Sequence, residues 1–434
     1  MSALLLGIGA LAALLLLLAL GLEIAFSLAL VGAVGLFLLG GIPLVTGLLA
    51  TVPYSNVASF TLVVLPMFIL MGELAVTAGM AQKAYVSARA WLGRLPGGLM
   101  MTAIGASTVF AAVSGSSVAA TTTIGRVSIE EMRRCGYNGG LAAGTVAVAG
   151  TLAALIPPSA LAVFYALVAN QSISRMLMAG LLPGLLSAAL FLIAANLTAR
   201  RFPNLAPLSR ERVGWKERLS SLKMTAPFGT LVLIVLGGIY SGFTTATEAA
   251  AFGALGALGL LALSGRLSSS ALQQALSATA RTTCMIFMII VGGMLFSRFL
   301  AFSGVPLALT DFVRGLDISP LAVVVVMMLI LTVLGMFIDP VGMTMLTLPF
   351  FLPIVMDLGL DPIWFGVLIV LQAELSVITP PIGIHLFVVR QITPDVSLGS
   401  IIAGTLPYLF CQFLVLALTI FFPDIALWLP GKLN

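Results

Sequence analysis

The chain has 434 residues, of which 60% are hydrophobic and only 8% are charged. A soluble domain usually carries about 25% charged residues, so this composition excludes an ordinary water-soluble protein, including a soluble enzyme. The net charge of +5 comes from basic residues in short loops, which does not support nucleic-acid binding. At roughly 20 residues per membrane span, the apolar content predicts an all-α protein that crosses a lipid bilayer many times.

Ten apolar segments are long enough to cross a membrane as helices. They are 3–22, 26–43, 58–79, 138–168, 176–199, 227–244, 247–264, 281–302, 362–390 and 398–422. No basic residue precedes the first segment, so it is expected to be a span and not a cleaved signal.

Two further apolar segments, 95–134 and 319–357, are interrupted by polar residues. The first breaks at Ser114-Gly115-Ser116-Ser117 and the second at Asp339-Pro340. Each half is about as long as one helix, and a re-entrant helical hairpin fits both segments. Two ordinary spans joined by a short loop are the alternative, but a serine run or Asp339 would make an unusual external loop in such apolar surroundings.

The basic residues predict the orientation. With ten crossings and two hairpins that do not cross, both termini lie on the same side. Placing the termini outside puts 16 of the 20 lysine and arginine residues inside, where positive charge is retained. The basic segment 200–226 is therefore expected to be a cytoplasmic amphipathic linker.

The chain also contains an internal repeat. A single constant shift along the sequence aligns Pro157-Pro158 with Pro380-Pro381, Asn138 with Asp361, and the break at Ser116 with Asp339. Five crossings separate the third span from the eighth, and because five is odd the second copy is inverted. Inverted repeats with broken helices are typical of secondary transporters.

The first candidate site combines the serine break with Gly150-Thr151 and the Pro157-Pro158 break. Two consecutive prolines should unwind the span, and the freed carbonyls with nearby hydroxyls are oxygen ligands that suit sodium. Helix N-termini after the breaks would attract an anion. We assign the substrate's acidic group to Ser114, Ser116 and Ser159, and a sodium ion to Ser117, Gly150, Thr151 and Pro157. Close helix packing through small residues is the structural alternative.

The second candidate site is the repeat-related partner of the first. A carboxylate within a membrane segment is costly and marks an ion path by default. We assign a second sodium site to Gly335, Asp339, Glu374, Thr379, Pro380 and Gly383. Glu73 and Glu248, near span ends, are expected to be structural, and Arg298 is expected to extend to the membrane surface.

Several other kinds of chemistry are not expected. The chain has no phosphate-binding glycine loop and so no sign of ATP hydrolysis. Its three dispersed cysteines and single histidine do not form a disulfide framework or a multi-histidine metal site. We expect no cofactor, no catalytic residue and no metal beyond sodium. An intramembrane hydrolase using Ser116 and His385 is a remote alternative, since helix packing is the commoner role for such a histidine.

The residues resemble the large membrane subunit of tripartite ATP-independent periplasmic (TRAP) transporters. The matching stretches are 65–74, 95–98, 114–119, 132–137, 150–152, 156–159, 335–339, 365–367, 379–383 and 422–425. They follow one another in order over nearly the whole chain. Asn138-Gly139 departs from the family's usual Asp-Pro, and Arg126 stands where an apolar residue is expected.

The resemblance implies a sodium-driven, elevator-type importer of the bacterial inner membrane, with both termini in the periplasm. Its partners would be a small four-helix membrane subunit and a periplasmic binding protein that delivers an organic acid anion. The implied units are 1–57 (first scaffold helices), 58–199 (repeat 1), 200–226 (linker), 227–280 (scaffold helices of repeat 2), 281–422 (repeat 2 core) and 423–434 (tail). A self-sufficient ion-coupled permease of similar architecture is the alternative transporter.

Overall fold

The structure, a computed structural model, describes residues 3–208 and 213–432. These residues form helices and contain no β-strand. The elements are α1 (Ala3–Ala19), α2 (Ile24–Val57), η1 (Phe60–Val63), α3 (Val64–Thr77), α4 (Met80–Leu92), α5 (Gly98–Ser114), α6 (Ser117–Arg134), α7 (Gly139–Ala149), α8 (Leu152–Leu155), α9 (Ala160–Val168), α10 (Ile173–Arg201), α11 (Trp215–Tyr240), α12 (Ala246–Leu263), α13 (Ser269–Ser303), α14 (Val305–Gly315), α15 (Pro320–Gly335), α16 (Pro340–Asp357), α17 (Pro362–Ser376), α18 (Ile384–Ile392), α19 (Leu398–Phe421), α20 (Asp424–Leu427) and η2 (Pro430–Lys432).

The described residues form a polytopic helical membrane protein. Eight of their helices are long and apolar enough to cross a bilayer, and a further candidate is α7–α8 with α9, which is bent by 44° at the predicted break. The α1 helix and α17, the first half of the predicted span 362–390, are apolar but shorter. The backbones of α7 and α19 are in contact, because a Cβ atom added to Gly144 would collide with the backbone of Gly404. Small residues allow membrane helices to approach each other this closely.

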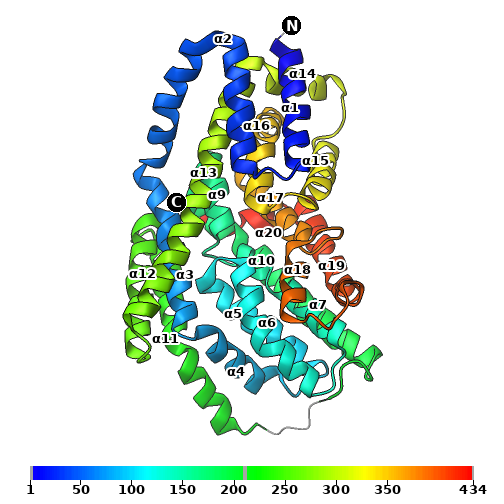
Figure 1. Ribbon diagram of the computed structural model, residues 1–434. Coiled ribbons are helices and arrows are strands. Elements are labelled where there is room, and N and C mark those ends of the chain that lie inside the picture. The colour runs from blue at the N-terminus through cyan, green and yellow to red at the C-terminus, as the bar shows by residue number, and fades with distance from the viewer. Residues whose placement is uncertain (1–2, 209–212, 433–434) are drawn as a thin grey trace.

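Three helices extend beyond their predicted bounds. The α2 helix was expected to end near residue 43 but continues to Val57, and at Gly41, whose φ is 71°, the chain turns back on itself (Figure 1). The α11 helix begins at Trp215, inside the predicted linker 200–226, and α13 begins at Ser269, inside the predicted unit 227–280. Residues 209–212 of the linker lie outside the described residues. For α11 and α13, the polar residues at the start of each helix carry too little apolar periodicity to predict where the helix begins.

The repeat is visible in the register of the elements. The shift that aligns Pro157 with Pro380 also carries the bounds of α6, Ser117–Arg134, onto those of α16, Pro340–Asp357. The helices also begin in the same way, because Ser116 and Asp339 cap α6 and α16 with their side-chain oxygens. Packing follows the repeat as well: α2 packs along α13, and the repeat-related pair α12 and α3 pack together. Each helix thus packs against a helix of the other half of the chain, and the two pairs correspond to each other, as expected for two halves related by a two-fold axis.

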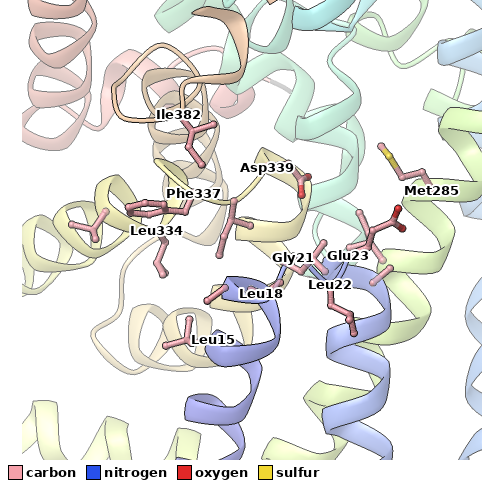
Figure 2. Close-up of a pocket in the computed structure, with 16 residues that line it drawn as sticks. Leu15, Leu18, Gly21, Leu22, Glu23, Met285, Leu334, Phe337, Asp339 and Ile382 are labelled. Atoms are coloured by element: carbon pink, nitrogen blue, oxygen red, sulfur yellow. The ribbon is translucent and has the colours of Figure 1, made fainter. Parts of the chain in front are cut away.

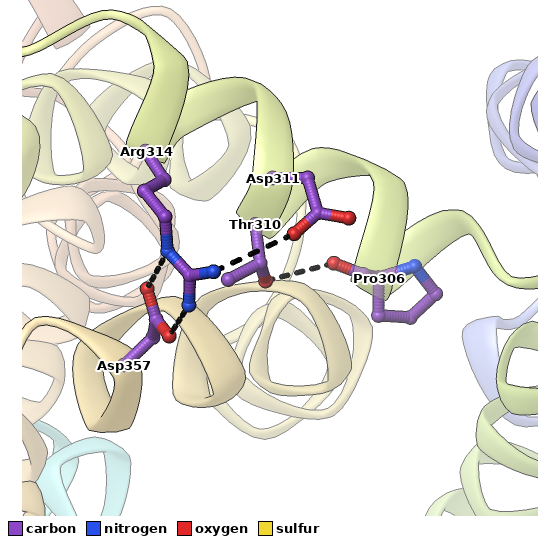
Figure 3. Close-up of polar contacts among 5 residues, drawn as sticks. All are labelled: Pro306, Thr310, Asp311, Arg314 and Asp357. Carbon is purple, nitrogen blue, oxygen red and sulfur yellow. Dashed lines mark hydrogen bonds and ion pairs between the residues drawn. The ribbon is translucent and has the colours of Figure 1, made fainter.

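Two short connecting helices, α4 and α14, were not predicted. Each begins after a glycine with positive φ, Gly79 at 78° and Gly304 at 74°. Each is also joined by an ion pair to the second arm of the hairpin that follows it, through Arg89–Glu131 for α4 and Arg314–Asp357 for α14. Figure 3 shows the second of these, in which Arg314 meets both carboxylate oxygens of Asp357 and also faces Asp311.

A third ion pair ties the first hairpin to the second half of the chain. Arg133, in the last turn of α6, donates to both carboxylate oxygens of Asp395 at 3.1 and 2.5 Å. These hydrogen bonds hold the pKa of Asp395 below its usual range. The end of the first hairpin is thereby attached to the turn before α19.

Candidate functional site

The tip of the first hairpin is a tight turn between α5 and α6. Gly115 ends α5 in a left-handed conformation, with a φ of 60°. Ser116 then caps α6, its hydroxyl accepting a hydrogen bond from the Ala119 N–H at 3.3 Å. The Ser114 hydroxyl closes the turn by accepting from the Ser116 N–H at 3.3 Å. The serine run therefore makes a compact tip whose hydroxyls remain close together.

This tip docks onto the break of the α7–α9 helix, as the sequence pattern predicted. The Ala160 N–H donates to the Gly115 carbonyl at 3.3 Å. A Cβ atom at Gly115 would lie 2.6 Å from the Pro158 carbonyl oxygen, so nothing larger than glycine fits. Ser159 caps α9 by accepting from the Ala162 N–H at 3.1 Å. The two breaks of the first repeat thus form one structural unit.

Gly115→Ala is expected to destabilise this unit. The substitution forces a left-handed conformation on a residue with a side chain and pushes a methyl group against the Pro158 carbonyl. Such strain costs about 1–3 kcal/mol, which thermal unfolding of the purified protein in detergent would measure. Gly359→Ala is the matched control, since Gly359 also has a positive φ but an added Cβ would meet nothing within 4 Å. Equal destabilisation by both variants would show that docking on Pro158 contributes nothing.

The second repeat builds a similar unit around Asp339. Asp339 caps α16, its carboxylate accepting from the Val341 and Gly342 N–H groups at 3.1 and 3.0 Å. The hairpin reaches the break of α17–α18 at Gly335, where a Cβ atom would collide with the Ser376 side chain. Across that break, the His385 N–H donates to the Val377 carbonyl at 3.0 Å. Both hairpins therefore end against a broken helix.

Between the two tips lies a cavity of about 220 Å³, which we call the central cavity. Both hairpin tips, α3, α9 and α13 contribute to its wall. Its polar lining residues are Glu73, Ser114, Ser116, Ser117, Thr282, Asp339 and Glu374. Of the described residues that line it, three are carboxylates and none is lysine, arginine or histidine. These carboxylates do not converge closely enough to form a single metal site within residues 3–208 and 213–432.

Glu374 is the most enclosed of the three carboxylates, with 1% of its surface exposed. The Ser117 side chain is its polar neighbour, and its second carboxylate oxygen has no hydrogen-bond partner among the described residues. A buried carboxylate with a free oxygen is costly unless a cation or a proton accompanies it. Glu374 therefore requires a proton or a cation beside it.

A larger space of about 760 Å³ adjoins the central cavity and shares Met285 and Asp339 with it. Figure 2 shows Asp339 at the hairpin tip across from the turn between α1 and α2, where Glu23 also faces this space. The rest of the lining is largely apolar, with Leu18, Leu334 and Phe337 among its residues. Asp339 thus lines two neighbouring spaces at the boundary between the second hairpin and the first helices.

The predicted site residues divide into two groups. Ser114, Ser116, Ser117, Asp339 and Glu374 line the central cavity. The others lie in the surrounding helix breaks and are not among its lining residues: Gly150, Thr151, Pro157, Ser159, Gly335, Thr379, Pro380 and Gly383. Among these, the hydroxyls of Thr151 and Thr379 bond to their own helices at the Val148 and Leu375 carbonyls.

Sequence reasoning missed Glu73 and Thr282 as cavity residues. Glu73 lines the central cavity because its neighbour Gly72 packs against Ser114, where an added Cβ would lie 2.6 Å from the carbonyl oxygen. Thr282 does so from α13. Both stand in ordinary span segments, and no sequence signal marked either as a cavity residue.

Ser116 and His385 have separate partners. His385 Nδ1 lies 2.9 Å from the Ala147 carbonyl and 3.3 Å from the Thr121 hydroxyl, which attaches α18 to α6 and α7. The Ser116 hydroxyl caps α6. This arrangement gives the histidine a packing role and provides no nucleophile–base pair for a hydrolase.

A family model described as "Tripartite ATP-independent periplasmic transporter, DctM component" matches residues 11–425. The C4-dicarboxylate TRAP transporter large permease protein DctM of Pseudomonas aeruginosa is 35% identical over 378 residues, covering 86% of this chain and 87% of that protein. The sialic acid TRAP transporter large permease protein SiaM of Vibrio cholerae is 31% identical, with the same coverage. The isethionate TRAP transporter permease protein DctMQ of Oleidesulfovibrio alaskensis is 30% identical, covering 92% of this chain and 66% of that protein.

Two solved transporters share the fold. The Alcanivorax borkumensis YdaH transporter superposes with a TM-score of 0.64 at 15% sequence identity, covering 97% of this chain and 99% of that one. Neisseria gonorrhoeae MtrF superposes with a TM-score of 0.60 at 13% identity, covering 95% and 94%. At these identities the likeness concerns the fold alone.

Proposed function

This chain belongs to the DctM component family of tripartite ATP-independent periplasmic transporters, and from that membership we propose that it imports an organic acid anion together with sodium. It is a large permease subunit and a multi-pass membrane protein. The proposal concerns the coupling ion, the substrate class and the route of delivery.

The charge of the central cavity supports cation coupling. Glu73, Asp339 and Glu374 line it without a basic residue among the described lining, and an organic anion entering this space would add further negative charge. Repulsion between like charges in a low-dielectric interior opposes its binding. Cations bound beside the carboxylates remove this repulsion, so that anion and cation bind together. This is the observation that carries the proposal.

The oxygen-rich breaks supply the cation sites. We assign one sodium ion to Ser117, Gly150, Thr151 and Pro157, and another to Gly335, Asp339, Glu374, Thr379, Pro380 and Gly383. Carboxylates, hydroxyls and backbone carbonyls are the ligands that hard cations prefer. The substrate's acidic group is assigned to Ser114 and Ser116, whose hydroxyls line the central cavity, and to Ser159 at the adjoining helix break.

The relatives support the substrate class and the partners. Their names specify C4-dicarboxylates, sialic acid and isethionate, which are all organic acids. We propose that this chain works in the inner membrane with a small four-helix membrane subunit and a periplasmic binding protein. In this assembly the hairpins and broken helices move as a transport domain against the remaining scaffold helices.

Uptake by the reconstituted complex tests the proposal. The chain, with its small membrane subunit and binding protein in liposomes, is expected to accumulate one labelled acid from a panel of succinate, N-acetylneuraminate and isethionate when sodium is outside. Replacing sodium with choline should abolish accumulation. Uptake by this chain alone would instead identify a self-sufficient permease, and accumulation unaffected by choline would refute sodium coupling.

Cysteine labelling tests the orientation of the chain. Ser270→Cys and Leu316→Cys, in a background without Cys135, Cys284 and Cys411, introduce thiols at two exposed positions, one at the start of α13 and one directly after α14. In whole cells, an impermeant thiol reagent should label residue 316 and leave residue 270 unlabelled until the cells are permeabilised. Labelling of both positions in intact cells would contradict the proposed inverted topology.

A further inference from the structure

A second polar cavity, of about 390 Å³, lies at the opposite end of α9 from the central cavity. We call it the outer cavity, since the proposed topology places it outside. Its polar side chains belong to Ser55, Asn56, Ser59, Thr61, Asn170 and Gln171. Unlike the central cavity, it has no acidic or basic residue among the described residues that line it.

The same three helical segments line both cavities. On α9, Leu161 lines the central cavity and Ala166 lines the outer one, and the two residues are separated by little more than one helical turn. On α13 the corresponding residues are Ile286 and Ile290. The third segment is η1 with α3, which lines the outer cavity at its start and the central cavity further along. The cavities are therefore neighbours along a common wall.

The repeat relates the walls of the two cavities. The shift that aligns the two halves of the chain carries Ser59 and Leu62, which line the outer cavity, onto Thr282 and Met285, which line the central cavity. In transporters built from inverted repeats, one repeat or bundle moves against the other around the binding site. If the two halves exchange conformations between transport states, Ser59 and Leu62 would line the binding site in the opposite state, as Thr282 and Met285 do in this one.

We propose that the outer cavity is an additional binding site for the organic acid anion, on the wall that the central cavity reaches in the opposite transport state. This inference rests on the proposed function. The exposed side chains of Ser59, Thr61 and Asn170 line the cavity and make no hydrogen bond to another described residue, so their donors are available to a carboxylate or sulfonate. Because no carboxylate lines the described wall of the outer cavity, the anion binds there without sodium, in contrast to the central cavity.

Thiol reactivity tests this proposal without transport. Ser59→Cys, in the cysteine-free background, is treated with the anionic 2-sulfonatoethyl methanethiosulfonate and with its cationic trimethylammonium counterpart. The measurement uses the solubilised complex in choline buffer without sodium. Ser241→Cys is the matched control, since Ser241 is exposed but does not line the outer cavity. Asn56→Cys is a second reporter in case Ser59→Cys folds poorly.

The ratio of the anionic to the cationic rate constant is expected to be about two- to tenfold higher at residue 59 than at residue 241, the range that one ordinary hydrogen bond supplies. Succinate or isethionate should slow modification at residue 59 alone. A ratio at residues 59 and 56 that is equal to or below the control would overturn the outer site.

Uptake separates this inference from the proposed function. Ser59→Asp places a negative charge in the outer cavity and is expected to raise the half-saturation for substrate about tenfold, with Asn204→Asp, in the linker, as the control. Unchanged substrate dependence in Ser59→Asp would count against the outer site while the proposed function stands. If the unmodified complex takes up none of the acids, the proposed function fails, and the labelling ratio still decides whether the outer cavity binds anions.

Discussion

Asp339→Asn is expected to lower sodium-driven uptake by about ten- to a hundredfold, the effect of losing one contact to a charged group. Asparagine keeps a side-chain oxygen that can cap a helix, here α16 through the Val341 and Gly342 N–H groups. What it lacks is the negative charge, which faces both the central cavity and the larger space beside it. Asp339→Ala removes the cap as well, so uptake should fall severely while the protein is still expressed.

Asp361→Asn is the matched control for Asp339→Asn. Asp361 caps α17 in the same way, accepting from the Ile363 and Trp364 N–H groups at 2.7 and 3.3 Å, but it lines neither space. Uptake by this variant should remain near the parent level. Initial rates over a sodium titration would be measured for all three variants. Parent-like sodium dependence in Asp339→Asn would show that the second cation site is elsewhere.

Glu374→Gln is expected to raise the half-saturation for sodium by about ten- to a hundredfold. The substitution preserves size in a fully enclosed position and removes the charge from a carboxylate with one unpartnered oxygen. Since the carboxylate faces the central cavity, loss of its cation should also weaken substrate binding by removing a positive charge beside the anion. Isotope uptake at varied sodium and substrate concentrations separates the two effects.

Glu248→Gln provides the control for Glu374→Gln. Glu248 is exposed and forms a capping box with Thr245 at the start of α12, which glutamine can also form. Its sodium half-saturation should not change. If Glu374→Gln behaved in the same way as Glu248→Gln, the buried carboxylate would have a structural role, and the cation balance of the central cavity would depend on Asp339 and Glu73.

The sequence predicted the structure best at the helix breaks, because the residues that form a break are of recognisable types. Serine and aspartate are good helix-capping residues, and Ser116 and Asp339 each follow a chain reversal, so both hairpin tips and the repeat that relates them could be read directly. Connecting helices α4 and α14 gave no such signal. They are short and amphipathic, with one apolar side, and a pattern of this length does not distinguish a surface helix from a loop.

Side-chain roles within the site were harder to predict than its location. Ser114 and Ser159 flank the two breaks of the first repeat, yet only Ser114 lines the central cavity, while Ser159 is buried as a helix cap. A hydroxyl after a break can satisfy its own helix or face a ligand, and residue type does not decide between them. Glu73 was misjudged for a related reason, because its cavity-facing position depends on the packing of Gly72 against the distant Ser114.

The ion pairs of α4 and α14 attach these short helices to the hairpins, which the proposed transport motion would carry. Arg314–Asp357 fixes α14 to its hairpin, while Gly304 joins it to α13 through a left-handed residue with no neighbour within 4 Å of an added Cβ. If the hairpins move as proposed, α14 would act as a rigid lever that pivots at Gly304. This helix is only about three turns long, and α4, which follows Gly79, is of similar length. In the proposed motion, the length of each connecting helix would then limit how far its hairpin travels, whatever substrate the complex carries.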